Sequence, residues 1–366
     1  MNLLTHLLYT PLLIDVKHIF INVIYIFIFL LVVLFIFIAA YSIYAHRREI
    51  NKKRWEEGIA DLINEAIFSE DETGLVDIHK QPGKLLNNAH YRQCCIDEII
   101  KTRKALSATS GHGLKTLYER LNLDKDSFKK LSRRSWQKKA KGIQELSLME
   151  QGKYVKNIFR LTTHKNETVR NEAQCGLVSY YGFLGLRFLN VTLHPISEWQ
   201  QIQLLNKLSA VKSENTAMLS RWLKSDMESV VIFSIKLAAF YKNFAVYDTV
   251  MHCLQHRNEK VKMHVLKYLE TIPAEDAPDR IIKEYATADK IFRLAIIDTL
   301  KQIGNIKQVA FLLIQLNDRD DDIKAAAAKA LTSIHPSGGA FLQTYSYAEI
   351  YPWKTIFQQV KNELAA

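Results

Sequence analysis

The longest apolar stretch of the chain lies near its start, from Ile19 to Tyr44. These 26 residues contain no charged side chain, and only Asn22 and Ser42 are clearly polar. As an α-helix they would reach about 39 Å, which exceeds a hydrocarbon core of about 30 Å. A helix satisfies its own backbone hydrogen bonds in lipid, whereas a lone strand does not. The pattern therefore predicts a transmembrane helix over 19–44.

The charges that flank this span predict its orientation. Only Asp15 and Lys17 precede it, whereas five basic residues and Glu49 follow it. These five form a membrane-interface basic cluster: Arg47, Arg48, Lys52, Lys53 and Arg54. The positive-inside rule places 45–366 in the cytoplasm, at the inner membrane, and 1–18 outside. A cleaved signal peptide is the competing interpretation, but the apolar run is long for one and no basic cluster precedes it.

In the C-terminal half, apolar residues recur every 31 positions. One such column runs through Ala173, Leu204, Ile235, Leu266, Ile297 and Ala328. Within a copy, apolar residues extend at helical spacing, as at Val261, Val265 and Leu269. Polar residues that favour helix starts, such as Asn258, precede this helix. Each copy is therefore predicted to be a helix, a short polar turn and a second helix.

One such hairpin cannot bury its apolar face alone, so neighbouring copies must stack into an α-solenoid. The predicted fold class is all-α, with a single transmembrane helix followed by about six 31-residue hairpins. The predicted domains are an outer segment (1–18), the transmembrane helix (19–44), a basic juxtamembrane helical neck (45–134), the repeat array (135–336) and a C-terminal cap (337–366).

The repeat unit resembles the HEAT repeat family. The resemblance rests on an apolar and a basic residue near the start of the second helix: Val169 and Arg170, Val261 and Lys262, Phe292 and Arg293, Ile323 and Lys324. The copy around Trp199 departs from this pattern, because Pro195 to Glu198 replace its acidic turn. An anchor followed by such repeats looks like membrane-anchored bacterial HEAT-repeat proteins. The resemblance implies a binding scaffold rather than a catalyst.

Basic residues concentrate in the neck and at the start of the array. Residues 101–141 hold 13 Lys or Arg and three acids, within a chain whose net charge is +11. Seven form the candidate binding residues of the basic neck: Lys129, Lys130, Arg133, Arg134, Lys138, Lys139 and Lys141. We place Arg134, Lys138 and Lys141 on one helical face. Anionic lipid headgroups, an acidic protein partner or a merely solvated face each account for this charge. A membrane anchor disfavours nucleic acid.

No sequence motif for phosphate binding, nucleotide binding or hydrolysis is present. His252 and His256 are spaced to hold two zinc ligands, but zinc needs at least three, so surface histidines explain them better. Adjacent Cys94 and Cys95 are expected to be structural residues within a helix. We therefore predict no catalytic residue, no cofactor and no metal.

The sequence thus favours a non-enzymatic scaffold or adaptor that binds a protein partner through its repeats. A membrane enzyme such as an envelope polysaccharide synthase, or a signalling protein, would suit it as a client. Two alternatives stay open. One is an anionic-lipid-binding membrane module that uses the basic neck, and the other is a HEAT-like enzyme of the lyase type without a recognisable motif.

Overall fold

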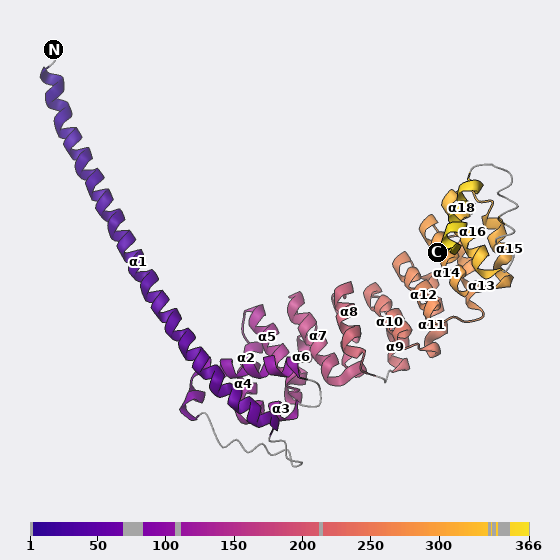
Figure 1. Cartoon of the computed structure of the whole chain (residues 1–366), viewed down its shortest axis with the longest axis horizontal. Helices are drawn as coiled ribbons and strands as arrows, with labels where there is room; N and C mark the ends of the chain where they lie inside the picture. Colours follow the sequence, from indigo (N-terminus) through magenta and orange to yellow (C-terminus); the bar gives the residue numbers. More distant parts are fainter. Residues whose placement is uncertain are drawn as a thin grey trace. The chain divides into compact units, whose positions relative to one another are not determined.

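The computed structural model describes residues 3–68, 83–106, 111–211, 215–335, 338, 342 and 352–365. Every regular element in these ranges is helical (Figure 1), so the predicted all-α fold class is confirmed. The chain divides into two compact units, residues 1–129 and 130–366.

The first unit is built around a long helix, α1 (Leu3–Phe68). It runs through both the predicted outer segment and the predicted span without a break. Its later part buries Ile59, Leu62 and Ala66. The other elements of the unit are η1 (Gly83–Asn87), α2 (Ala89–Ala105), α3 (His112–Arg120) and α4 (Leu123–Leu131).

Unlike the later part of α1, its apolar part is not covered by other described residues. An 18-residue window has a mean hydropathy of 3.3, and none of it is buried within the structure. The helix is therefore long and apolar enough to cross a membrane, a length and composition that a signal sequence can also have.

The second unit is a row of helical hairpins with two layers (Figure 1). Consecutive inner helices pack on one another. They are α5 (Trp136–Leu148), α7 (Glu167–Tyr181), α8 (Glu198–Leu208), α10 (Glu228–Phe240), α12 (Glu259–Thr271), α14 (Lys290–Ile303) and α16 (Asp321–Ile334). The outer layer consists of η3 (Gly152–Tyr154) with α6 (Val155–Arg160), η4 (Gly182–Asn190), α9 (Thr216–Trp222), η5 (Phe244–Val246) with α11 (Tyr247–His252) and η6 (Cys253–Gln255), α13 (Ala277–Tyr285), and η7 (Ile306–Gln308) with α15 (Val309–Gln315).

Side-chain caps explain where the inner helices begin. The side chains of Asn166, Ser197 and Asp289 accept hydrogen bonds from backbone N–H groups of the first turn of α7, α8 and α14. Asn258 and Asp320 do the same for α12 and α16. Each cap satisfies a donor that the helix itself leaves unpaired. The polar residues before the inner helices thus act as the predicted start signals.

The second outer element departs from the expected α-helix. Residues 182–190 form the 3-10 helix η4. Gly182, with φ of 58°, ends α7 in a backbone conformation that glycine adopts easily. Gly185 packs so closely on the backbone carbonyl of Leu177 that an added Cβ would collide with it. Gly185 therefore lets η4 pack closely against α7.

Packing along the inner layer is uneven. The contact between α8 and α10 is the smallest between consecutive inner helices. Polar bonds also cross this boundary: Lys236 Nζ donates to Gln201 Oε1 at 2.8 Å, and the backbone N–H of Ile196 donates to Ser229 Oγ at 3.0 Å.

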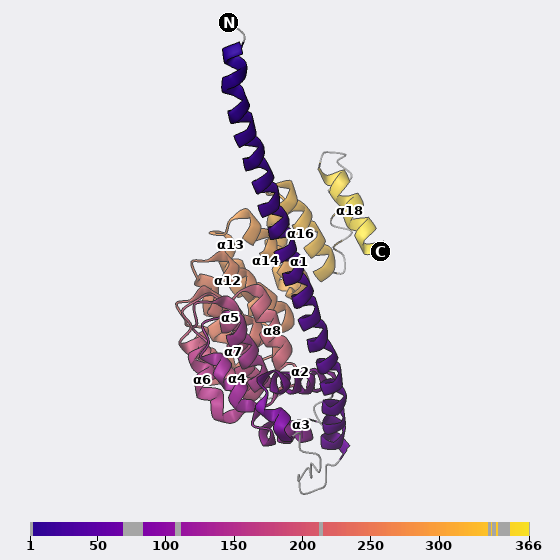
Figure 2. The ribbon, with the colours of Figure 1, turned by 90° about the vertical axis from the view of Figure 1, so that its left-hand side faces the viewer.

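The far end of the row is closed by α18 (Trp353–Ala365), which packs against α16 (Figure 2). Ile356 and Val360 of α18 are buried in the same apolar core as the inner helices. Much of the predicted cap, including residues 343–351, lies outside the described residues.

Candidate functional site

Two of the seven candidate neck residues serve the fold itself. Lys130 Nζ lies 2.5 Å from a carboxylate oxygen of Glu145, and the two side chains are 15% and 2% exposed. Lys139 Nζ donates to the backbone carbonyl of Leu131 at 3.0 Å. Both bonds fix the turn that leads into α5, so these two ammonium groups are occupied.

The other neck residues are exposed. Lys129 lies 3.9 Å from Asp126 and is 68% exposed, and Lys141 is also exposed. Arg133, Arg134 and Lys138 have no ion-pair partner among the described residues. Helix α5 begins at Trp136 after its N-cap Ser135, so Arg134 lies in the preceding turn. The prediction that it shares a helical face with Lys138 and Lys141 is wrong, because α5 begins only after Arg134.

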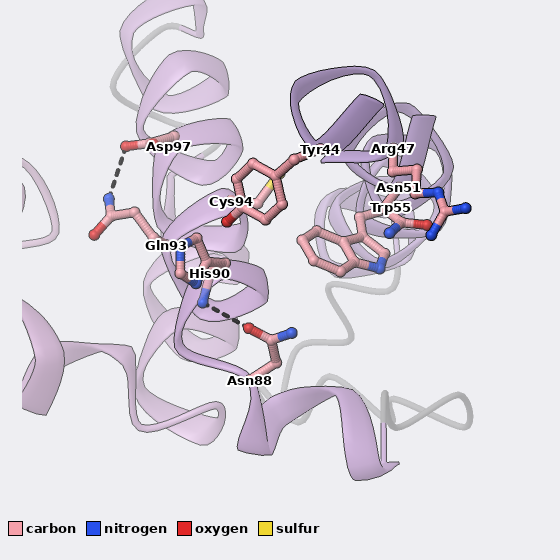
Figure 3. Close-up of a pocket in the computed structure, with 9 residues that line it drawn as sticks. All are labelled: Tyr44, Arg47, Asn51, Trp55, Asn88, His90, Gln93, Cys94 and Asp97. Atoms are coloured by element: carbon pink, nitrogen blue, oxygen red, sulfur yellow. Dashed lines mark hydrogen bonds between the residues drawn. The ribbon is translucent and has the colours of Figure 1, made fainter. Parts of the chain in front are cut away.

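One residue of the membrane-interface basic cluster, Arg47, lines a cavity of about 460 Å³ between α1 and α2. In Figure 3 the rings of Tyr44 and Trp55 face α2, while the Arg47 guanidinium extends beyond them, away from α2. Trp55 meets Tyr91 edge-on at 5.6 Å between ring centroids. The cavity is therefore walled mainly by aromatic rings on the α1 side.

The adjacent cysteines and one of the two spaced histidines, His256, have structural surroundings. Cys94 and Cys95 are buried in α2, and burial raises the pKa of the Cys95 thiol to about 12. His256 Nδ1 accepts the backbone N–H of Asn258 at 3.0 Å, which supports the turn before α12. Among the described residues, no three His, Cys, Asp or Glu side chains are grouped to hold a metal ion.

A second candidate site is a groove of about 940 Å³ across the exposed side of α8, α10 and α12, and it reaches Ile291 at the start of α14. We call it the inner-helix groove. Its apolar lining includes Ile232 and Met263, both half-buried, and Ile291, which is 69% exposed. Charged side chains of both signs stand around this floor: Glu198, Glu228, Lys260 and Lys267.

Cations on two neighbouring helices shape the electrostatics of the groove. Burial lowers the pKa of Lys236, which donates to Gln201 across the α8–α10 boundary. Burial, together with Lys236 and Lys267, lowers the pKa of His264 to about 4. His264 is therefore neutral at neutral pH. The groove combines apolar contact area with polar groups at its rim, as protein interfaces do.

The 31-residue register of the sequence carries a signal for this groove. Ile232 and Met263 are one 31-residue repeat apart, and each is half-buried on its inner helix and lines the groove. The register placed them at equivalent positions, but only the structure shows that this side of the inner helices faces solvent.

These features define an α-helical solenoid with an exposed inner-helix face. Residues 247–332 match the family model described as HEAT repeats. No curated protein sequence matches the chain.

The chain is similar to several solved structures, and two of them show the level of likeness. An engineered protein from the Northeast Structural Genomics Consortium is 11% identical, with coverage of 82% of this chain and 87% of its own and a TM-score of 0.34. Human deoxyhypusine hydroxylase, solved in complex with glycerol, is 12% identical, with coverage of 78% and 98% and a TM-score of 0.31. Likenesses at this level carry no functional argument.

Proposed function

We propose that this protein is a single-pass inner-membrane scaffold whose cytoplasmic HEAT repeats bind a protein partner in the inner-helix groove. The observation that carries the proposal is the exposed apolar floor of Ile232, Met263 and Ile291 within a charged rim. Burying such side chains against a partner is favourable by about 25 cal/mol per Å² of apolar surface. The rim charges would then set orientation and specificity.

The apolar part of α1 supports the membrane half of the proposal. A bare helix with a mean hydropathy of 3.3 finds a favourable environment in lipid. Tethering raises the effective concentration of a partner near the membrane without a tight interface. A membrane enzyme that builds envelope polysaccharide, or a signalling protein, would gain from this arrangement. Binding without catalysis remains our prediction.

Two isoleucines allow a matched test of the groove. Ile291 lines it and is 69% exposed, whereas Ile314 on the outer helix α15 is 67% exposed. The full-length protein is purified in mild detergent, and stoichiometric companions are identified by mass spectrometry. Ile291→Glu should abolish the companion, because a carboxylate would have to be desolvated in the interface.

Ile314→Glu provides the control, since it adds the same charge at equal exposure away from the groove. The companion should survive this substitution. A companion that is lost equally from both variants, or that survives Ile291→Glu, contradicts binding in the groove. Turnover of a small molecule by the purified protein without a companion contradicts the scaffold proposal as a whole.

A second candidate function is binding of anionic lipid headgroups by the basic neck. It is favoured by Arg133, Arg134 and Lys138, which are exposed and have no ion-pair partner among the described residues. Each such cation near an anionic leaflet is worth about 1 kcal/mol. Replacing these three residues with Gln spares the structural bonds of Lys130 and Lys139. When the variant is reconstituted in anionic vesicles, fewer cleavage sites in the neck should be protected from protease than in the unmodified protein. In neutral vesicles the two proteins should be cleaved alike.

A further inference from the structure

A second cavity, of about 570 Å³, opens in the outer layer between α6, η4 and the end of α7. Its charged lining residues are all basic: Lys156 and Arg160 from α6, and Arg187 from η4. All three are exposed, and none makes an ion pair with another described residue. We call this site the cation pocket.

Elsewhere in the outer layer, an arginine at the equivalent position is paired with two carboxylates. Arg280 of α13 lies 3.0 Å from Asp248 and 3.4 Å from Asp276. Arg187 occupies the equivalent position three repeats earlier, and the positions equivalent to the two aspartates carry Val155 and Phe183. The neutralising carboxylates found beside Arg280 are therefore replaced by apolar side chains beside Arg187.

The apolar part of the pocket is exposed as well. Phe159, Tyr181 and Leu184 line it and are 37%, 48% and 50% exposed. Aromatic and arginine side chains gathered at one spot are the composition of binding hot spots in protein interfaces. On a surface that meets only solvent, nothing is gained by grouping three like charges beside exposed aromatic rings.

We infer that the cation pocket receives an acidic segment of a protein partner, with an aromatic or aliphatic side chain beside its carboxylates. The carboxylates would take the place of the missing aspartates, and the apolar side chain would cover Tyr181 and Leu184. A nucleic-acid backbone needs cations spread along a stripe rather than three around one apolar cavity. The inference rests on the proposed function, since it takes the partner to be a protein.

The test uses full-length protein in detergent and fluorescent peptides. One peptide alternates Glu or Asp with Leu and Phe, a second replaces Leu and Phe by Ser, and a third replaces the acids by Lys. The first should bind tightest, with the second at least about tenfold weaker and affinity falling as salt is raised. The third should not bind.

Arg160→Glu with Arg187→Glu should weaken the first peptide at least about tenfold. The matched control is Lys224→Glu with Lys283→Glu, which makes the same change in net charge at exposed lysines outside the pocket. It should change affinity less than about twofold. Milder Arg160→Gln and Arg187→Gln variants should give intermediate losses, which keeps the test informative if the reversal disturbs folding.

Equal loss in the reversal and control variants would overturn the inference, as would equal binding of the first two peptides. Tighter association of the pocket with an oligonucleotide or with phosphatidylglycerol vesicles than with the acidic peptide would also overturn it. Ile291→Glu separates this inference from the proposed function. This substitution should abolish co-purification of the companion, because it disrupts the groove, and should leave the affinity for the first peptide unchanged. If the companion is lost in Ile291→Glu but no peptide binds at the cation pocket, this inference is wrong while the proposed function stands.

Discussion

Lys129 and Lys130 are neighbours in α4 with different surroundings. Lys129 is 68% exposed, whereas Lys130 reaches the nearly buried carboxylate of Glu145. Removing one partner of a buried ion pair leaves a charge without compensation, while an exposed pair contributes little. The pairing of Lys130 with Glu145 could not be predicted from spacing, because the two residues lie on different helices.

This contrast gives a matched pair of substitutions. Lys130→Ala should lower the free energy of unfolding by about 3 kcal/mol. Lys129→Ala should lower it by less than about 1 kcal/mol. Urea denaturation of the purified chain, followed by circular dichroism, measures both. Equal effects would show that Glu145 does not depend on Lys130.

His264 predicts a pH dependence of stability. Its pKa is about 4 in the folded protein, against an ordinary value of 6.5. As pH falls below 6.5, His264 binds a proton in the unfolded chain but not in the folded chain. The free energy of unfolding therefore decreases from pH 6.5 to pH 4. After allowance for solvent screening this amounts to about 1–2 kcal/mol.

The measurement is the unfolding midpoint at several pH values between 7 and 4. His264→Gln should flatten the decline in this window. Met263→Leu, which changes the neighbouring groove residue without adding or removing a titrating group, should leave the slope as it is. An unchanged slope in His264→Gln would mean that other groups produce the acid sensitivity.

At the scale of elements, the 31-residue register predicted the inner helices well. Every member of the column that starts at Ala173 is buried, from Leu204 to Ala328. Register fixes which residues are equivalent, but it does not say which neighbours they meet. The groove and the cation pocket both depend on neighbours, and for that reason neither was predicted.

The element that escaped prediction is η4, and Gly185 tests what holds it. Gly185→Ala should destabilise the protein by about 2 kcal/mol, because its Cβ would collide with the backbone carbonyl of Leu177. Gly58→Ala is the control, since nothing lies within 4 Å of its added Cβ in α1. It should stabilise that helix by about 0.5–1 kcal/mol. Thermal unfolding compares the two, and a tolerated Gly185→Ala would contradict the tight packing.

At the scale of the whole molecule, the prediction concerns where the chain sits. The intact protein should stay with membranes after an alkaline carbonate wash. Residues 45–366 should resist protease added outside spheroplasts. Leu31→Lys with Phe35→Lys should release it, since each central lysine costs about 3 kcal/mol in an inserted helix. Leu184→Lys, at an exposed apolar position outside the span, should not.

Intact-mass spectrometry addresses the competing interpretation. A full-length mass from the membrane fraction supports an uncleaved anchor. A mature chain that lacks the apolar segment and is recovered outside the cell would show that the segment is a signal peptide, and the proposed cytoplasmic scaffold would then be wrong.

The small contact between α8 and α10 has a mechanical consequence. In a row where each hairpin is held by its neighbours, a pull applied along the row concentrates at the weakest joint. Here that joint is bridged by Lys236 and Ser229 and lies beneath the groove. A ligand that contacts both α8 and α12 would connect the two sides of this contact. Ligand binding should therefore make the repeat array stiffer under load.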